Sequence, residues 1–242
     1  VTNPPIDSLR ENKVMSLKTR FGNLGNILDF DNLTQENIYV LDSPILTNSQ
    51  LKKFKKFFLK KIKVIDCTFD IKSSLKDRIE AIREETETAV REGSTALILS
   101  DKNISNQKAS IPSILTVGAV HSHLVKHGLR GYCSLNVECS DALDTHSFAV
   151  LIGVGATTVN PYLAIDSIYQ RFEKKLFGKS DFESCVIKFK KSIDAGLLKI
   201  MSKMGISVIS SYRGGCNFEA VGLSRAIVSD YFSGMSSRIS GI

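Results

Sequence analysis

Short apolar runs alternate with helical segments about every thirty residues between 63 and 177, and this alternation most constrains the fold. The runs lack the in-out pattern of a half-exposed strand, which is typical of strands buried on both faces of a parallel sheet. We expect strands at 64–69, 95–99, 133–138 and 157–160, and helices at 73–92, 111–127, 144–152 and 161–177. The chain is therefore predicted to be an α/β protein of repeated βα units at 63–177, forming a parallel sheet or half-barrel flanked by helices.

Polar residues follow the predicted strands, at the position where parallel sheets place their active groups. These residues are Asp66, Asp70, Ser100, Asp101, Glu138 and Asn160. A free-standing α/β module would bind a small ligand among them. However, no spacing assigns acid or base roles, and neither a nucleophile elbow nor a phosphate-binding loop is present. We therefore assign no catalytic residue.

The first fifty residues differ from the repeat. Asn3-Pro4-Pro5 opposes a helix at the start, and Gly22 and Gly25 mark loops. A short helix is predicted at 7–17, with Asp7 as its cap. Residues 1–50 are therefore expected to wrap around the core as an irregular segment.

The C-terminal part also differs. A long helix is predicted at 182–203 and a strand at 206–210, so we place a domain boundary near residue 180. Beyond the helix, glycines at 205, 214, 215, 222 and 241 indicate tight turns or close backbone approach. Residues 181–242 are thus interpreted as a connecting helix and the start of a further unit.

The charge of +7 is concentrated in one helical stretch, 52–63. Leu51, Phe54, Phe58 and Ile62 recur at helical spacing, with lysines on the remaining face. Such a stretch either binds lipid or phosphate, or is an ordinary surface helix; the second interpretation is favoured because no other basic stripe supports the first. We predict no nucleic-acid partner and, with no apolar run of about 20 residues, no membrane partner.

Cysteine and histidine usage indicates a reducing compartment and no assigned metal. Five cysteines form no disulfide-type pattern and no apolar signal region opens the chain, so a cytoplasmic location is expected. His123 and His127 share a helix face and have zinc-type spacing, with His146 as the one candidate third ligand. We favour surface or capping histidines. Cys67, Cys133 and Cys139 are interpreted as small core residues.

Several ordered motifs extend over nearly the whole chain. They are VTNPPIDSLRENKVMSL at 1–17, SPILTN at 43–48, AVHSH at 119–123, THSFA at 145–149, NPYLA at 160–164 and SYRGGCNFEAVGLSRA at 211–226. In this order they resemble the glutamate synthase family, from the start of its central domain to the entry of its flavin-binding barrel. The last motif resembles most the large subunit of the bacterial, NADPH-dependent type.

This resemblance implies an enzyme that makes two glutamates from glutamine and 2-oxoglutarate. Ammonia released by an amidotransferase domain passes through a tunnel to a barrel carrying FMN, and electrons arrive through a 3Fe-4S cluster and a small FAD/iron–sulfur subunit. The chain would be the central domain (1–180) and the barrel's start (181–242). It begins with Val1, not with the family's cysteine nucleophile, and ends before the cluster cysteines. The chain alone is expected to hold no cofactor and no catalytic activity.

The resemblance also suggests two local sites. Thr47 and Asn48 would line the ammonia tunnel, or simply form a turn after Ser43-Pro44. Met204, Gly205, Ile206 and Ser207 would pass under the flavin as the first barrel strand, or pack without touching a ligand. Arg213 would suit a phosphate or dicarboxylate.

Overall fold

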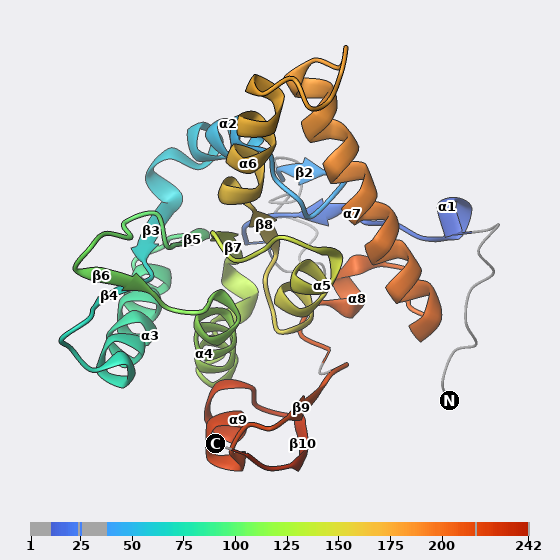
Figure 1. The fold of residues 1–242 in the computed structure, drawn as a ribbon. Helices are drawn as coiled ribbons and strands as arrows, with labels where there is room; N and C mark the ends of the chain where they lie inside the picture. Colours follow the sequence, from blue (N-terminus) through green and yellow to red (C-terminus); the bar gives the residue numbers. More distant parts are fainter. Residues whose placement is uncertain (1–10, 24, 26–37, 216, 242) are drawn as a thin grey trace.

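A computed structural model describes residues 11–23, 25, 38–215 and 217–241. Its centre is a parallel sheet in the order β3-β5-β7-β8, so strands that follow one another as βα units are also neighbours (Figure 1). The strands are β3 (Ile62–Asp66), β5 (Ala96–Ser100), β7 (Ser134–Glu138) and β8 (Thr158–Asn160). The predicted fold, a parallel α/β sheet flanked by helices, is confirmed.

The helices of the βα units begin within two residues of their expected starts, and two of them have a side-chain cap. Ser74 accepts a hydrogen bond from Asp77 N and starts α3, and Asp144 does the same with Ser147 N for α5. The helices are α3 (Leu75–Arg91), α4 (Ser113–Lys126), α5 (Thr145–Gly153) and α6 (Tyr162–Glu173). Local capping chemistry therefore fixes where α3 and α5 start, whereas α4 and α6 each begin directly after a proline.

The first predicted strand is interrupted. Asp66 accepts hydrogen bonds from Thr68 N and Thr68 Oγ1, and this turns the chain just after β3. The residues beyond form β4 (Thr68–Asp70), which pairs antiparallel with β6 (Lys108–Ser110), a strand that the sequence did not predict. The expected strand at 64–69 was therefore too long.

One face of the sheet is covered by α3, α4 and α5, which lie below it in Figure 1. Leu97 and Leu99 of β5 and Leu135 and Val137 of β7 project into this core and are almost fully buried. Alternate residues thus give a continuous apolar layer, and its burial is the main stabilising contribution on this side.

The other face is covered by α2 (Asn48–Phe58). Ala96 and Ile98 of β5 pack in a second cluster with Leu51 and Phe54 of α2 and with Phe21. The short 3-10 helix η2 (Leu59–Lys61) then leads into β3, which contains Ile62. The apolar stripe of the basic stretch is therefore covered by protein, as a surface helix requires.

The N-terminal segment runs along the edge strand β8. Ile45 forms a parallel bridge with Val159, and Leu46 N donates to Val159 O. Farther back, α1 (Glu11–Val14) is the described part of the helix expected at 7–17, and β1 (Thr19–Arg20) pairs with β2 (Val40–Leu41). Ser43 Oγ donates to Asp194 of α7 over 2.6 Å, which ties this wrapping segment to the C-terminal part.

The long helix α7 (Phe182–Met204) agrees with its prediction, and Gly205 ends it in a left-handed conformation with φ of 69°. Ile193, Leu197 and Met201 belong to the same core as the sheet. No helix among the described residues has the length and apolar run needed to cross a bilayer.

The strand expected at 206–210 is wrong. Only Val208 forms a bridge, with Ser16, and the chain then turns into α8 (Ile209–Tyr212). A strand needs a partner along its length, and the N-terminal segment offers one residue. The remaining elements are β9 (Glu219–Val221), α9 (Arg225–Tyr231) and β10 (Ser236–Ile239), and β9 pairs parallel with β10.

Candidate functional site

The polar strand ends meet at one edge of the sheet, as the sequence predicts. Asp66 is the register partner of Ser100, Ser100 of Glu138, and Glu138 of Asn160. This carboxyl edge is therefore a row of four polar side chains. Whether it is available to a ligand depends on what each side chain already contacts.

Glu138 lies at the centre of the row and is 3% exposed. Its carboxylate accepts from Lys102 Nζ at 2.9 Å, Ser100 Oγ at 3.0 Å and Lys55 Nζ at 3.4 Å. Burial raises the pKa of Glu138, but the Lys102 hydrogen bond and the charges of Lys55 and Lys102 outweigh it, so the pKa is lowered. Glu138 is thus an ionised carboxylate whose oxygens already have partners.

Asp101 is also buried and engaged. Its Oδ2 accepts from Ser140 N at 2.9 Å, from Ser140 Oγ at 2.6 Å and from Ser110 Oγ at 3.2 Å. Burial and the neighbouring Asp101 carboxylate raise the pKa of Tyr162. Asp66 is likewise held by Asn103 and Thr68. The acids at this edge therefore stabilise the loops around them.

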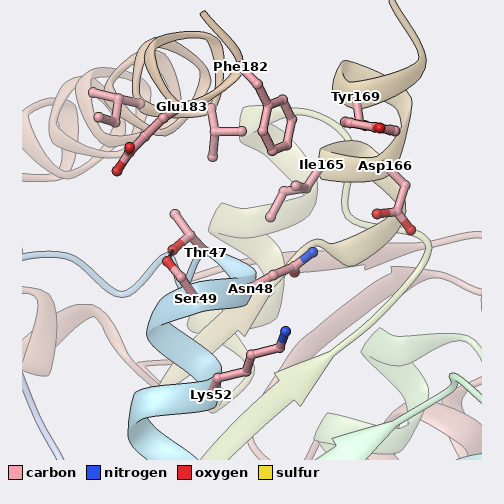
Figure 2. A pocket seen from close by; sticks show the side chains of 11 residues that line it. Thr47, Asn48, Ser49, Lys52, Ile165, Asp166, Tyr169, Phe182 and Glu183 are labelled. Carbon is pink, nitrogen blue, oxygen red and sulfur yellow. Dashed lines mark hydrogen bonds between the residues drawn. The ribbon is translucent and has the colours of Figure 1, made fainter. Parts of the chain in front are cut away.

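Space opens beyond β8, where a cavity of about 550 Å³ lies between the start of α2, α6 and the start of α7 (Figure 2). The cavity is lined by Thr47, Asn48, Ser49, Lys52, Ile165, Asp166, Tyr169, Phe182, Glu183, Val186 and Ile187. The rings of Tyr169 and Phe182 are 5.4 Å apart and form its apolar wall. Its volume is in the range of small-molecule pockets.

Thr47 and Asn48, the predicted tunnel residues, both line this cavity. Thr47 is the N-cap of α2 and forms a reciprocal capping box with Gln50. Asn48 Oδ1 accepts from Asn160 Nδ2 at 3.0 Å, while Asn160 Oδ1 is buried and accepts no hydrogen bond from any described residue. The segment thus ends in a helix cap, as the turn interpretation requires, and also borders a cavity.

The predicted flavin-contacting residues lie elsewhere. Met204 ends α7, Gly205 caps it, and Ile206 packs against the main core. Ser207 O accepts from Ser16 N at 2.8 Å, so this segment joins α7 to the N-terminal segment.

Arg213 lies at the opposite, amino edge of the sheet, beside Arg130 and His121. Burial, and then the charge of Arg130, lower the pKa of Arg213 to about 10. Its Nε is buried and has no hydrogen-bond partner within the described ranges. The structure therefore brings Thr47 and Asn48 together and places Arg213 apart from them.

Arg130 organises this amino edge and was not singled out from the sequence. Its guanidinium donates to His121 Nδ1 at 3.1 Å, to Cys133 O at 2.7 Å and to Gly155 O at 2.8 Å. Burial, followed by the charges of Arg130 and Arg213, lowers the pKa of His121 to about 4. His121 is therefore a neutral acceptor at neutral pH.

The other histidines separate into two places. His123 and His127 lie on α4 with Glu87 of α3, whereas His146 lines a different cavity with Asp141. The acidic neighbour was missed because it comes 36 residues before His123 on another helix.

The interpretation of three cysteines as small core residues is confirmed. Cys67, Cys133 and Cys139 are buried, and burial raises the pKa of each thiol. Cys216 lies outside the described residues.

A parallel α/β domain with a cavity at the carboxyl end of its edge strand is the class that the fold and site define. The family described as glutamate synthase central domain matches residues 1–224. The chain belongs to the glutamate synthase central domain family.

Curated relatives match along the full chain. Identity is 56% to the glutamate synthase [NADPH] large chain of Azospirillum brasilense and 42% to that of Bacillus subtilis, each covering 100% of this chain and 16% of the relative. The chain thus spans about a sixth of the length of these relatives. The flavin-binding domain of baker's yeast flavocytochrome b2 aligns with a TM-score of 0.45 and 15% identity, over 79% of this chain and 44% of that one, which is too distant to carry a conclusion.

Proposed function

We propose that this chain is the connecting, ammonia-channelling domain of an NADPH-dependent glutamate synthase large chain, with no reaction centre of its own. The observation that carries the proposal is the family match over residues 1–224. The 16% share of the relatives' length supports the view that further domains of the same polypeptide supply the chemistry. The ion pairs of Glu138 with Lys55 and Lys102 support the absence of a catalytic acid or base at the centre of the carboxyl edge.

In the proposed enzyme, the cavity of Figure 2 belongs to the ammonia path. Thr47 offers a hydroxyl and Asn48 an amide, and small polar groups of this kind exchange hydrogen bonds with ammonia. Asn160 is fully buried and donates to Asn48 Oδ1, which holds the Asn48 amide in the cavity wall. The rings of Tyr169 and Phe182 supply an apolar wall that limits competing water.

The cofactor part of the proposal concerns residues 181–242. Met204, Gly205, Ile206 and Ser207 would pass under FMN once the rest of the barrel is present, and Arg213 would bind an anionic group of the cofactor or substrate. The buried, unpartnered Nε of Arg213 supports the second assignment. A 3Fe-4S cluster and a small FAD/iron–sulfur subunit that accepts electrons from NADPH would complete the enzyme in the cytoplasm.

The channelling role is tested in the complete large chain with the substitution Asn48→Leu. Glutamate synthesis is measured with amide-¹⁵N glutamine while unlabelled ammonium is present in the medium. We expect the variant to incorporate the unlabelled nitrogen, whereas the wild type incorporates ¹⁵N, because ammonia escapes where the polar wall is lost.

Asn106→Leu, at an exposed loop position, is the matched control and should channel like the wild type. Unchanged ¹⁵N incorporation in Asn48→Leu would contradict a role of this cavity in the ammonia path. Synthesis supported by ammonium alone should persist in Asn48→Leu, since the reducing centre is untouched.

A titration of the purified chain with FMN and with 2-oxoglutarate separates the proposal from a free-standing binding module. A ligand that binds the folded state raises the melting temperature in proportion to its excess. No shift is expected with either compound. A saturable shift would assign a working site to the chain itself.

A further inference from the structure

A cluster of three potential metal ligands lies between α3 and α4, on the side of the sheet away from the cavity of Figure 2. The two helices pack side by side (Figure 1), and Glu87 of α3 faces His123 of α4 and His127, the C-cap residue of that helix. The histidines are four residues apart, so both rings project from one face of α4. The ligand atoms of all three side chains lie within 4.8 Å of one another.

One carboxylate oxygen is shared between the two rings. Glu87 Oε2 lies 2.6 Å from His123 Nε2 and 3.8 Å from His127 Nδ1. The side chains are partly exposed, at 22% for Glu87, 18% for His123 and 35% for His127. A cation from solution can therefore reach them, while the surrounding helices restrict their rotation.

Arg91, one turn further along α3, already orients the carboxylate of Glu87. Arg91 donates to the other oxygen of Glu87, from Nε at 2.9 Å and from Nη2 at 2.8 Å. This pairing leaves Oε2 directed at the histidines. Outer-shell hydrogen bonds of this kind fix the orientation of ligating groups in metal sites.

We propose that Glu87, His123 and His127 bind one zinc ion that joins α3 to α4. Two imidazole nitrogens and one carboxylate oxygen suit Zn²⁺, whereas Mg²⁺ and Ca²⁺ prefer oxygen ligands. With three protein ligands, water takes the fourth tetrahedral position. His127 Nδ1 also lies 2.8 Å from His123 O, and binding through this nitrogen exchanges that hydrogen bond for a bond to the metal.

The test uses His127→Gln in the purified protein, because this change removes one ligand and leaves the contact between Glu87 and His123. Chelator-treated protein is titrated with Zn²⁺ against a chromophoric chelator, and with Co²⁺ while visible absorption is recorded. We expect the zinc affinity at this site to fall by about 10-fold or more in the variant. At equal Zn²⁺ concentration, the melting temperature should therefore rise more in the wild type than in the variant.

His146→Gln is the control, because His146 is exposed and lies apart from the cluster. It should keep the full zinc stoichiometry and the Co²⁺ spectrum. Equal zinc stoichiometry and affinity in the wild type and in His127→Gln would overturn the proposal. If circular dichroism shows that His127→Gln is unfolded, Glu87→Gln carries the same comparison.

Discussion

The two edges of the central sheet differ in how they hold charge. At the carboxyl edge, Glu138 is neutralised by Lys55 and Lys102, and a cavity opens next to Asn160. At the amino edge, Arg130 is buried among carbonyl oxygens and His121, with no carboxylate among the groups that influence its pKa. One edge therefore holds its buried carboxylate in ion pairs, and the other holds a buried cation by hydrogen bonds to backbone carbonyl groups.

The two edges also differ in local packing. Gly155 and Gly214 both approach the His121 ring so closely that a Cβ at either position would contact it. This close packing fixes the backbone before β8, although a cavity of about 640 Å³ borders the other side of His121 and Gly214. The carboxyl edge retains a cavity of about 550 Å³, as parallel α/β folds commonly do. Substitutions should therefore affect folding most at the amino edge.

The largest effect is expected for Gly155→Ala. Gly155 has φ of 130°, which an L side chain rarely adopts, and the new Cβ would overlap the His121 ring. Backbone strain and overpacking each cost about 1–3 kcal/mol, so the free energy of unfolding should fall by about 4 kcal/mol. Urea denaturation measures this change in the free energy of unfolding. Gly131→Ala, a neighbour of Arg130 with open space around it, should be nearly neutral; equal losses in both variants would show that the close approach to His121 is not the cause.

The next largest effect is a pH dependence from His121. Its folded-state pKa is depressed from 6.5 to about 4, so between these values the unfolded chain takes up a proton that the folded chain does not. The stability from neutral His121 is thus complete above pH 6.5 and is lost as pH falls towards 4, by up to about 3 kcal/mol. His121→Gln should flatten the pH dependence of urea unfolding in this window.

His146→Gln serves as the control for this measurement, because it removes a histidine that is exposed on α5 and lies apart from Arg130. A His121→Gln variant with the wild-type slope would show that the proton uptake comes from other groups. The neutral, buried state of His121 would then be disproved.

A smaller effect is expected at the carboxyl edge for Glu138→Gln. The amide cannot neutralise Lys55 and Lys102, which are themselves half exposed, so the loss should be about 1–2 kcal/mol at pH 7. Because the pKa of Glu138 is lowered on folding, this contribution is present above the ordinary glutamate range and is lost as pH falls through the folded-state value. Urea unfolding at pH 7 and pH 3 should therefore show the two proteins converging in acid; Glu84→Gln, at an exposed position, is the control.

The smallest effect concerns the cavity wall. Thr47→Ala removes the N-cap hydroxyl of α2 and should cost about 1 kcal/mol. Thr47→Ser retains the hydroxyl and should retain the stability, as measured by urea unfolding. If the alanine and serine variants are equally stable, the capping box does not fix this end of α2.

The sequence by itself determined the elements whose signals are local. Ser74, Asp144 and Asp181 cap helices at the expected starts because each side chain bonds a backbone N–H three residues on. The apolar runs between those helices became the parallel strands, and the polar strand ends met in one row because parallel strands end at the same edge. The resemblance carried by six ordered motifs agreed with the family match over residues 1–224.

Only the tertiary structure decided which distant groups meet. Glu87 of α3 contacts His123 of the neighbouring helix α4. Arg130, before β7, donates to Gly155 O, before β8. Asn48 accepts a hydrogen bond from Asn160, which comes 112 residues later in the chain. Periodic patterns in the sequence cannot predict these contacts, because the contacts depend on how whole helices and strands pack against one another. For the same reason the strand expected at 206–210 did not form: strand propensity is a local property, but a strand requires a partner, and packing left only Ser16 beside Val208.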